Sequence, residues 1–302
     1  MAISRGQLVK ELEPGLNALF GLEYKRYENQ HAEIYATETS DRAFEEEVML
    51  SGFAQAKVKS EGSGVAFDNA QETFTARYTN ETIALAFAIT EEAIEDNLYD
   101  RLASRYTKAL ARSMASTKNV KGASTLNNGN PGGTFTSGDG VTLFNTAHPT
   151  IAGTFSNTLA TASDLNETSL EQALIDINAF TDERGLKIAA KGVKMIIPSA
   201  LQFVAERLMK SQGRTSTADN DINAVRSMGM IPQGYRVNNY LTDADAFFIL
   251  TDVPNGMKHF NRAPLTTKME GDFDTGNVRY KARERYVFGV SDPRGIFSSP
   301  GA

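Results

Sequence analysis

Two alternating runs of apolar and polar positions dominate the chain between residues 44 and 79. In the first run, every second position is apolar, at Val48, Leu50, Ala54, Ala56 and Val58. The second run covers residues 73–79, and a Gly-Ser-Gly tip at residues 62–64 lies between the two. A period of two is typical of β-strands, so the pattern predicts a β-hairpin with a Gly-rich turn. With a rise of about 3.3 Å per residue, arms of about 15 residues would reach ~50 Å. A lone two-stranded ribbon is only marginally stable, so we expect it to lie on another surface.

The segments on either side of the hairpin carry weaker patterns. Residues 1–40 have no sustained period, and only four apolar residues have a spacing that suits a helix, namely Leu12, Leu16, Leu19 and Phe20. They predict an extended arm with one or two helical turns, broken near Gly21. Residues 83–89 alternate large apolar side chains with alanine, which predicts a strand covered on both faces.

A long helix is predicted to start near residue 90. Thr90 can cap it, and Glu91 and Glu92 follow in the first turn, where the helix dipole favours acidic side chains. Apolar side chains then recur at intervals of four, at Ile94, Leu98, Leu102, Tyr106, Leu110 and Met114. We expect a helix of roughly 28 residues that persists to about Lys118. With this face buried, Leu102→Asp would place an unpaired charge in the core, and the subunit would misfold.

The second half of the chain combines a long loop with a mixed α and β pattern. Residues 119–166 are rich in Gly, Asn, Ser and Thr, which is typical of loop structure. The elements expected after it are a helix capped by Thr168–Glu171 and ended by Gly185, a strand at Val193–Pro198, a helix capped by Ser199–Gln202 that runs to about Lys210, and strands in "GYRVNNYL" and "AFFILT". Residues 257–290 alternate again around Gly271 and Gly276, which predicts a returning β-ribbon.

Composition and charge are those of an ordinary globular protein. The 302 residues are 41% hydrophobic and 23% charged, and the net charge is −6 with a pI near 5.3. Apolar runs such as residues 83–89 are too short to span a bilayer, so we expect no membrane partner. The densest basic run, "RYKARER" at residues 279–285, is interrupted by Glu284 and predicts a solvated strand face, not a nucleic-acid site.

Sequence motifs for catalysis, cofactors and metals are absent. The chain has no cysteine, and its three histidines, at positions 31, 148 and 259, form no i, i+4 pair. Gly-x-Ser-x-Gly and P-loop motifs are also missing, so we expect no catalytic, cofactor-binding or metal-binding residue. His148 is expected to be buried or to cap a turn. Carboxylate pairs leave no short signature, so the acidic clusters at Glu45–Glu47 and Glu91–Glu92 leave a hydrolase open as an alternative.

The order of these parts resembles the major capsid proteins of tailed bacteriophages. The motifs that carry the resemblance are LFNTAHPT at residues 143–150, SN at 156–157, TSLEQAL at 168–174, AITEEAIEDN at 88–97 and VFGVSDPRGIF at 287–297. The first three are similar to the head subunits of the Mu-like branch. The resemblance spans nearly the whole chain and implies an α+β fold of the capsid type shared by tailed phages and herpesviruses.

The resemblance implies a division of the chain into five parts. These are an N-terminal arm at residues 1–40, an extended β-hairpin loop at 41–82, a peripheral domain with the spine helix and Gly-rich loop at 83–165, an axial domain at 166–256, and a peripheral β-ribbon with the C-terminal segment at 257–302. In this family the extended loop lies across a neighbouring subunit. The implied contact residues at its tip are Lys57, Lys59, Ser63 and Phe67.

The function implied by the resemblance is structural. The chain would assemble with itself into hexamers and pentamers of an icosahedral head that encloses double-stranded DNA, in the virion and after assembly in the bacterial host cytoplasm. Its arm looks too short to be a scaffolding domain, which implies a separate scaffolding protein. The resemblance also implies a portal protein as a partner and allows a decoration protein. The acidic net charge fits weak, non-specific contact with the packaged DNA.

Two alternatives and one chemical question stay open at this point. The same architecture is used by cellular nanocompartment shells that enclose an enzyme cargo, and a hydrolase belongs to a different class altogether. Some members of the capsid family also join subunits by an isopeptide bond between a loop lysine and an asparagine. Lys57 and Lys59 share one strand parity beside a flexible tip, which indicates a solvated face, so we expect no such bond.

Overall fold

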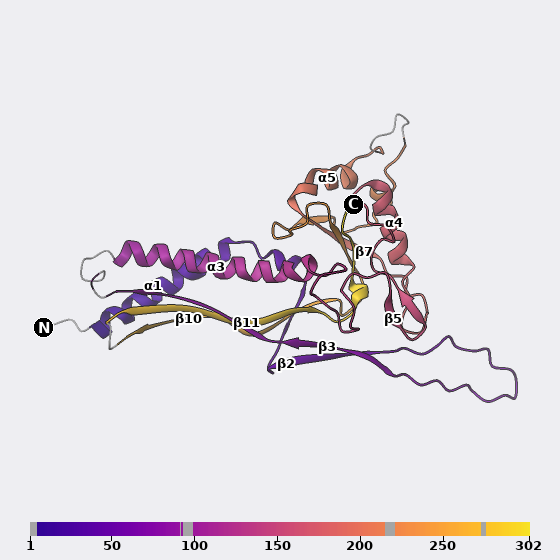
Figure 1. Cartoon of the computed structure of the whole chain (residues 1–302), viewed down its shortest axis with the longest axis horizontal. Coiled ribbons are helices and arrows are strands. Elements are labelled where there is room, and N and C mark those ends of the chain that lie inside the picture. The colour runs from indigo at the N-terminus through magenta and orange to yellow at the C-terminus, as the bar shows by residue number, and fades with distance from the viewer. Residues whose placement is uncertain (1–4, 91, 93–98, 215–220, 273–275) are drawn as a thin grey trace.

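The computed structural model describes residues 5–90, 92, 99–214, 221–272 and 276–302. Three parts are visible in Figure 1: a long sheet beneath two helices, a more compact α/β part at one end of that sheet, and a hairpin whose loop runs out beneath the compact part. The α+β fold class expected from the sequence is confirmed.

The elements follow one another in the order that the sequence pattern suggests. The described helices are α1 (Arg5–Arg26), α3 (Tyr99–Asn127), α4 (Glu167–Asn178), α5 (Gln202–Lys210) and α6 (Ala224–Met228), with 3₁₀ turns η1 (Gln30–Glu33), η2 (Ser199–Leu201) and η3 (Pro293–Gly295). The described strands are β1 (Ala36–Thr39), β2 (Phe44–Leu50), β3 (Glu72–Thr79), β4 (Glu81–Ile89), β5 (His148–Thr150), β6 (Gly153–Phe155), β7 (Gly192–Ile197), β8 (Tyr235–Val237), β9 (Phe247–Thr251), β10 (Met257–Gly271), β11 (Val278–Val290) and β12 (Ile296–Ser299).

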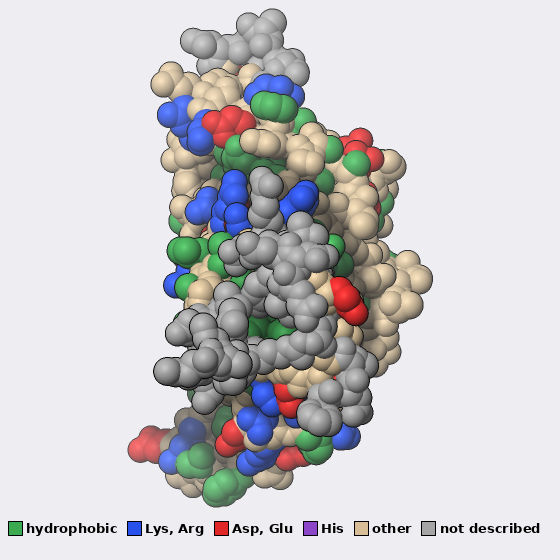
Figure 2. Space-filling model, turned by 90° about the vertical axis from the view of Figure 1, so that its left-hand side faces the viewer, with side chains coloured by type: hydrophobic (Ala, Val, Ile, Leu, Met, Phe, Trp, Pro, Cys, Tyr) green, Lys and Arg blue, Asp and Glu red, His purple; other side chains and the backbone are tan. Residues whose placement is uncertain are grey.

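The long sheet has the strand order β1-β10-β11-β4, with β1 parallel to β10 and the other pairs antiparallel. One face is buried under the helices, where Tyr280 and Ala282 of β11 join Leu110 and Met114 of α3 in one apolar cluster. The other face is solvated and carries the basic run, Arg279, Lys281 and Arg283. Figure 2 views the molecule from the left-hand side of Figure 1. Positive, negative and hydrophobic side chains are interspersed on the described surface seen there.

The compact sheet has the order β12-β9-β7-β8 and supplies the largest apolar core. Phe247 and Ile249 of β9 lie fully buried against Leu170 and Ile177 of α4. Phe297 of β12 completes this cluster, so a strand that follows the long sheet in sequence is built into the compact one. The predicted strands at "VKMIIP" and "AFFILT" are therefore confirmed as β7 and β9.

The expectation of an extended arm before residue 40 is wrong. Residues 5–26 form one continuous helix, α1, although Pro14 lies inside it. The apolar side chains of Leu16 and Phe20 are buried in the cluster beneath α3, so tertiary packing stabilises a helix that its own sequence disfavours. The helix also continues past Gly21, where the pattern suggested a break.

The long helix is confirmed, but its limits differ. Residue 91, residues 93–98 and the side chain of Leu102 lie outside the described residues, so the predicted start and the Leu102→Asp effect stay predictions. The helix runs past Lys118 to Asn127, where Gly122 allows His31 to approach its backbone: a Cβ at that position would lie 2.7 Å from the His31 Cβ. Residues at a strict interval of four lie about 40° apart around the helix, so Tyr106 lies at the edge of the buried side and is half exposed, whereas Leu110 and Met114 are buried.

The hairpin is confirmed at its base only. β2 and β3 pair antiparallel from Phe44 to Leu50, and residues 52–71 form no strand ladder. These residues are rich in small and polar types and have no surface to pack on, so cross-strand pairs there add little. The expectation of a strand covered on both faces at residues 83–89 is also wrong: β4 is an edge strand, and Leu85 is 47% exposed.

Helix caps in the compact part differ in detail from the sequence prediction. Asn166 caps α4 through a capping box with Ser169, two residues before the predicted Thr168. The helix ends at Asn178, and Gly185, with φ of 83°, lies in a later turn. The short helix α6 falls in a segment that was expected to be loop, and Ser199 makes no capping hydrogen bond.

Candidate functional site

Residues 51–71, the outer part of the extended loop, are the most exposed part of the described chain. Every residue from Gly52 to Gln71 is solvent-exposed. Val58 and Phe67 are each 98% exposed, so these apolar side chains have no contact surface in their own chain. Lys57, Lys59 and Ser63, the other predicted contact residues, lie on the same projecting segment, which runs out beneath the compact part in Figure 1.

Local hydrogen bonds shape the loop. Ser63 closes the tip by donating its hydroxyl and its backbone N–H to the Ser60 carbonyl, at 2.7 and 3.1 Å, and Gly62 supplies the left-handed backbone. Further back, the carboxylate of Asp68 accepts the Ala54 N–H at 2.7 Å, which ties the two arms together. Arg184 of the compact part donates to the Asn69 carbonyl at 2.6 Å and anchors the foot of the loop.

A buried polar network holds the hairpin base against the long sheet. Lys258 of β10 donates to Glu47 of β2 and, at 3.1 Å, to Glu38 of β1. Burial disfavours the charge of Lys258, but these hydrogen bonds outweigh it and raise its pKa. Ser291 donates to Glu47 and also bonds the Tyr78 hydroxyl, so β2, β3 and the end of β11 are fixed to one another.

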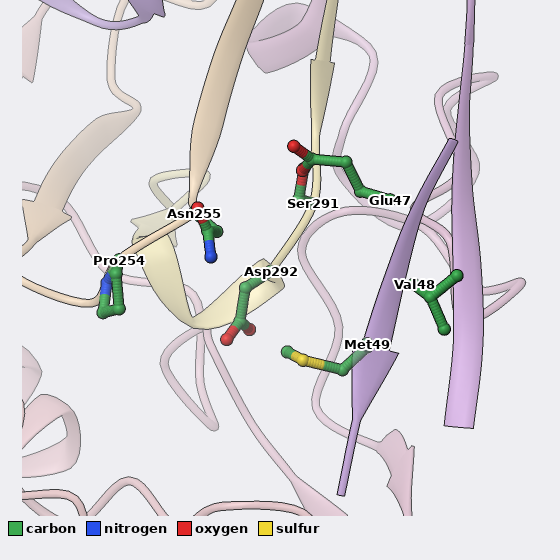
Figure 3. Close-up of a pocket in the computed structure, with 7 residues that line it drawn as sticks. All are labelled: Glu47, Val48, Met49, Pro254, Asn255, Ser291 and Asp292. Carbon is green, nitrogen blue, oxygen red and sulfur yellow. The ribbon is translucent and has the colours of Figure 1, made fainter. Parts of the chain in front are cut away.

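A groove opens beside this network, at the foot of the extended loop. A cavity of about 380 Å³ lies between β2 and the turn at residues 252–255, and Figure 3 shows Glu47, Met49 and Asp292 pointing toward it. A second cavity of about 330 Å³ adjoins it, and both are lined by Met49, Pro254 and Asp292. The far wall is fixed by a close backbone contact, because a Cβ on Gly256 would lie 2.8 Å from the Gly295 Cα.

Charged groups in the groove wall are buried and paired around Arg294. Its guanidinium donates to Glu183 at 2.7 Å and to Asp292 at 3.3 Å, and it lies over the Phe155 ring. Burial raises the pKa of Asp292, and the neighbouring Arg294 charge opposes that rise. The second oxygen of Glu183, Oε2, is buried without a hydrogen-bond partner in the part of the chain that the structure describes.

Three of the short motifs that carried the resemblance meet in space, those at residues 143–150, 156–157 and 287–297. His148 is fully buried, as expected, and bonds Asp139 at 2.6 Å and Asn157 at 3.0 Å through its two ring nitrogens. Asn157 in turn donates to the carbonyls of Leu143 and Pro293, at 2.7 and 3.1 Å. The network therefore joins the Gly-rich loop to Pro293 in the motif at residues 287–297. These short segments thus have a structural role.

The described acidic residues of the two clusters have separate surroundings. Along β2, Glu45 accepts from Ser40, Glu46 pairs with Arg77, and Glu47 bonds Lys258. Glu91 lies outside the described residues, and Glu92 is exposed. Within the described ranges no cluster of His, Asp and Glu could hold a metal ion, and no described helix is long and apolar enough to cross a membrane.

Comparison with known proteins agrees with this geometry. A family model described as phage capsid protein matches residues 72–299, and no curated protein matches the chain. The capsid of Myoviridae phage XM1 is similar at 12% identity and a TM-score of 0.55, covering 89% of this chain and 89% of that chain. The capsid of an empty GTA particle is similar at 14% identity and 0.55, covering 91% and 90%, and a virus-like particle from Pyrococcus furiosus at 10% and 0.51, covering 94% and 97%.

The fold and the family match together define a shell-forming protein of the phage capsid type. The family match spans most of the chain, so the chain belongs to the phage capsid protein family. It is a structural subunit of an icosahedral phage head and a component of the virion. The proteins of this family are structural proteins, not enzymes.

Proposed function

We propose that the chain forms hexamers and pentamers that together close a phage head around double-stranded DNA, with the extended loop as the clasp between neighbouring subunits. The observation that carries this proposal is the exposure of the loop: Val58 and Phe67 are almost completely in solvent. Apolar side chains at the end of a long projection lose unfavourable contact with water only when another chain covers them.

The four tip residues have distinct roles in this proposal. Phe67 supplies apolar area, Lys57 and Lys59 supply positive charge, and Ser63 closes the turn that presents them. A second copy of the chain is the partner that a shell offers to every subunit, so one type of contact repeats throughout the particle.

Finer assignments follow from the resemblance. We assign the chain to the Mu-like branch because of its motifs at residues 143–150, 156–157 and 168–174. The first two contain His148 and Asn157, whose buried hydrogen bond supports a structural role for these motifs. The division into arm, extended loop, peripheral domain, axial domain and C-terminal segment is proposed with the bounds given above. A separate scaffolding protein, a portal protein and a decoration protein are the proposed partners, and packaged DNA is touched weakly and without sequence preference.

Deleting Val58–Ala66 tests the clasp directly. The variant should remain a folded subunit, because the deleted residues contribute no buried side chain, yet it should form few closed shells. A control replaces the same segment with an equally long Gly-Ser sequence, which separates loop length from loop side chains. Electron micrographs with normal numbers of closed particles from the deletion would contradict the clasp.

Particle contents test whether the head encloses double-stranded DNA. Particles that assemble in phage-infected cells should contain it, detected by nuclease-protected absorbance at 260 nm. Particles that contain a protein cargo and no DNA would contradict this part of the proposal.

Covalent joining of the shell stays an expectation to be tested. Lys57 and Lys59 are exposed, and a lysine that attacks an amide must lose its proton, which requires a desolvated site. We expect mature particles boiled in detergent to give one band near the 32.9 kDa chain mass. A ladder of multimers would contradict this.

A further inference from the structure

The groove at the foot of the extended loop is acidic beyond what its own chain neutralises. Its carboxylates are those of Glu47, Asp182, Glu183, Asp252 and Asp292, against the guanidinium of Arg294. Glu47 is satisfied by Lys258, and Arg294 is shared by Glu183 and Asp292. The groove therefore keeps an excess of negative charge, which favours a cationic occupant.

A buried, unpartnered oxygen points to the same conclusion. Glu183 is 2% exposed, and only one of its two oxygens is bound, by Arg294 at 2.7 Å. Its other oxygen, Oε2, has no donor among the described residues, although Glu183 lines the groove. A buried carboxylate oxygen without a donor keeps its negative charge uncompensated in the groove wall, which adds to the attraction for a cation in the groove.

Apolar side chains are also left open in the groove. Leu50 is 62% exposed and Ile188 38% exposed, and Met49 and Val253 lie beside them. The occupant should therefore combine positive charge with at least one apolar side chain. Lys57-Val58-Lys59 is an exposed segment of this kind, with a valine 98% exposed between two lysines.

We propose that this groove receives the Lys57–Lys59 segment of the extended loop from a second copy of the chain. The proposal rests on the clasp function and names its acceptor surface. The loop cannot fill the groove of its own subunit, because Val58 lies eight residues beyond Leu50, about 26 Å along an extended chain that runs away from the groove. Long lysine side chains can reach the acidic wall while Val58 stays on the apolar surface.

The geometry of such a contact favours rings. A loop that leaves one subunit and enters the foot of the next makes a heterologous, head-to-tail contact, in which every subunit both gives a loop and accepts one. Repeated around an axis, this contact closes into a ring without leaving an unmatched groove. The inference therefore gives a physical basis for the pentamers and hexamers proposed above.

The absence of cysteine from the chain allows a direct test. Shells are assembled from a Val58→Cys, Val253→Cys variant and oxidised mildly, and the subunits are separated on a denaturing gel without reductant. We expect most of the chain to move from the monomer band into a ladder of multimers, which reductant collapses. Matched controls carry Val58→Cys alone, or Val58→Cys with Ile175→Cys, a position 60% exposed on α4 and outside the groove.

The possible outcomes separate the groove from the clasp. A ladder that is strong for the Val253 pair and weak for both controls supports the groove as acceptor. Closed shells with no ladder, or with equal ladders in all three variants, overturn the groove but leave the clasp intact. If the Val58–Ala66 deletion also assembles normally, the clasp itself is wrong.

A charge test gives a second, independent measurement. Lys57→Glu with Lys59→Glu should reduce the yield of closed shells at least tenfold, and Ile188→Lys, which places a like charge in the groove, should do the same. Ile175→Lys is the matched control and should assemble as wild type. Equal yields from the Ile188 and Ile175 variants would contradict the proposal.

Discussion

Similar apolar side chains are buried in the compact sheet and exposed in the extended loop. Phe247 and Ile249 in the compact sheet are fully buried, whereas Val58 and Phe67 in the loop are each 98% exposed. Burying a side chain of this kind stabilises a fold by about 1.5–3 kcal/mol. The compact part obtains this stabilisation within one chain, and the loop obtains it only in an assembly. Substitutions in the two regions should therefore affect different measurements.

The largest effect is expected in the compact core. Phe247→Ala leaves a cavity between β9 and α4 and should lower the free energy of unfolding by about 3–5 kcal/mol. Denaturant unfolding of the unassembled subunit measures this directly. A loss below about 1 kcal/mol would mean that the compact sheet is not the main core.

The long sheet should add a pH dependence of intermediate size. Burial lowers the pKa of His259 to about 3, with the Lys118 charge and His31 acting in the same direction, and burial also lowers the pKa of His31. Because the folded pKa is below the ordinary value of 6.5, this stability is complete above pH 6.5 and is lost as the pH falls toward 3. Each histidine contributes at most about 1.4 kcal/mol per pH unit.

A variant isolates the contribution of His259. Its ring stacks on Phe288 at 4.5 Å, so His259→Phe keeps the stacking and removes the titration. The slope of unfolding free energy against pH between 4 and 6.5 should become shallower in this variant. An unchanged slope would assign the acid sensitivity to other groups, such as His31, whose pKa is also lowered by burial.

Removing a helix cap should have a smaller effect. Asn166 accepts the Ser169 N–H at 2.8 Å, and the Ser169 hydroxyl accepts the Asn166 N–H at 3.0 Å in return. Asn166→Ala should cost about 1 kcal/mol of subunit stability, and Asn166→Asp much less, because Asp keeps the acceptor. Thermal unfolding of the two variants side by side checks the difference.

The smallest effect on the subunit is expected in the loop. Val58→Ser with Phe67→Ser should change the free energy of unfolding by less than about 0.5 kcal/mol, because both side chains are already in solvent. The same variant should assemble poorly. A clear loss of subunit stability would show that the loop packs on its own chain, and would end the contrast between the two regions.

The same contrast explains what the sequence could predict. Strands such as β7 and β9 are mostly apolar, and β11 alternates buried and exposed residues from Val278 to Glu284, so their positions follow from pattern alone. Helix α1 was missed because Pro14, Gly15 and Gly21 disfavour it, and only its packing under α3 stabilises it. Burial of β4 on both faces was expected because an edge strand has no signature that tells it from a central one.

The candidate site was predictable only in part. The position of the loop tip follows from alternation around Gly62, and its exposure follows from its length. The groove has no local signal, because Glu47, Glu183, Asp252 and Asp292 come from four separate segments of the chain. Only the folded backbone brings them together, so no spacing in the sequence could have identified them.

The place of β12 in the compact sheet has a consequence for biosynthesis. β12 pairs with β9, yet the whole β10–β11 ribbon separates the two strands in the chain. A ribosome that adds roughly 5–20 residues per second must therefore complete the ribbon before Phe297 can close the core around Phe247. Folding of the compact part is therefore coupled to synthesis of the long sheet, and a chain cut short before β12 would lack one strand of its largest core.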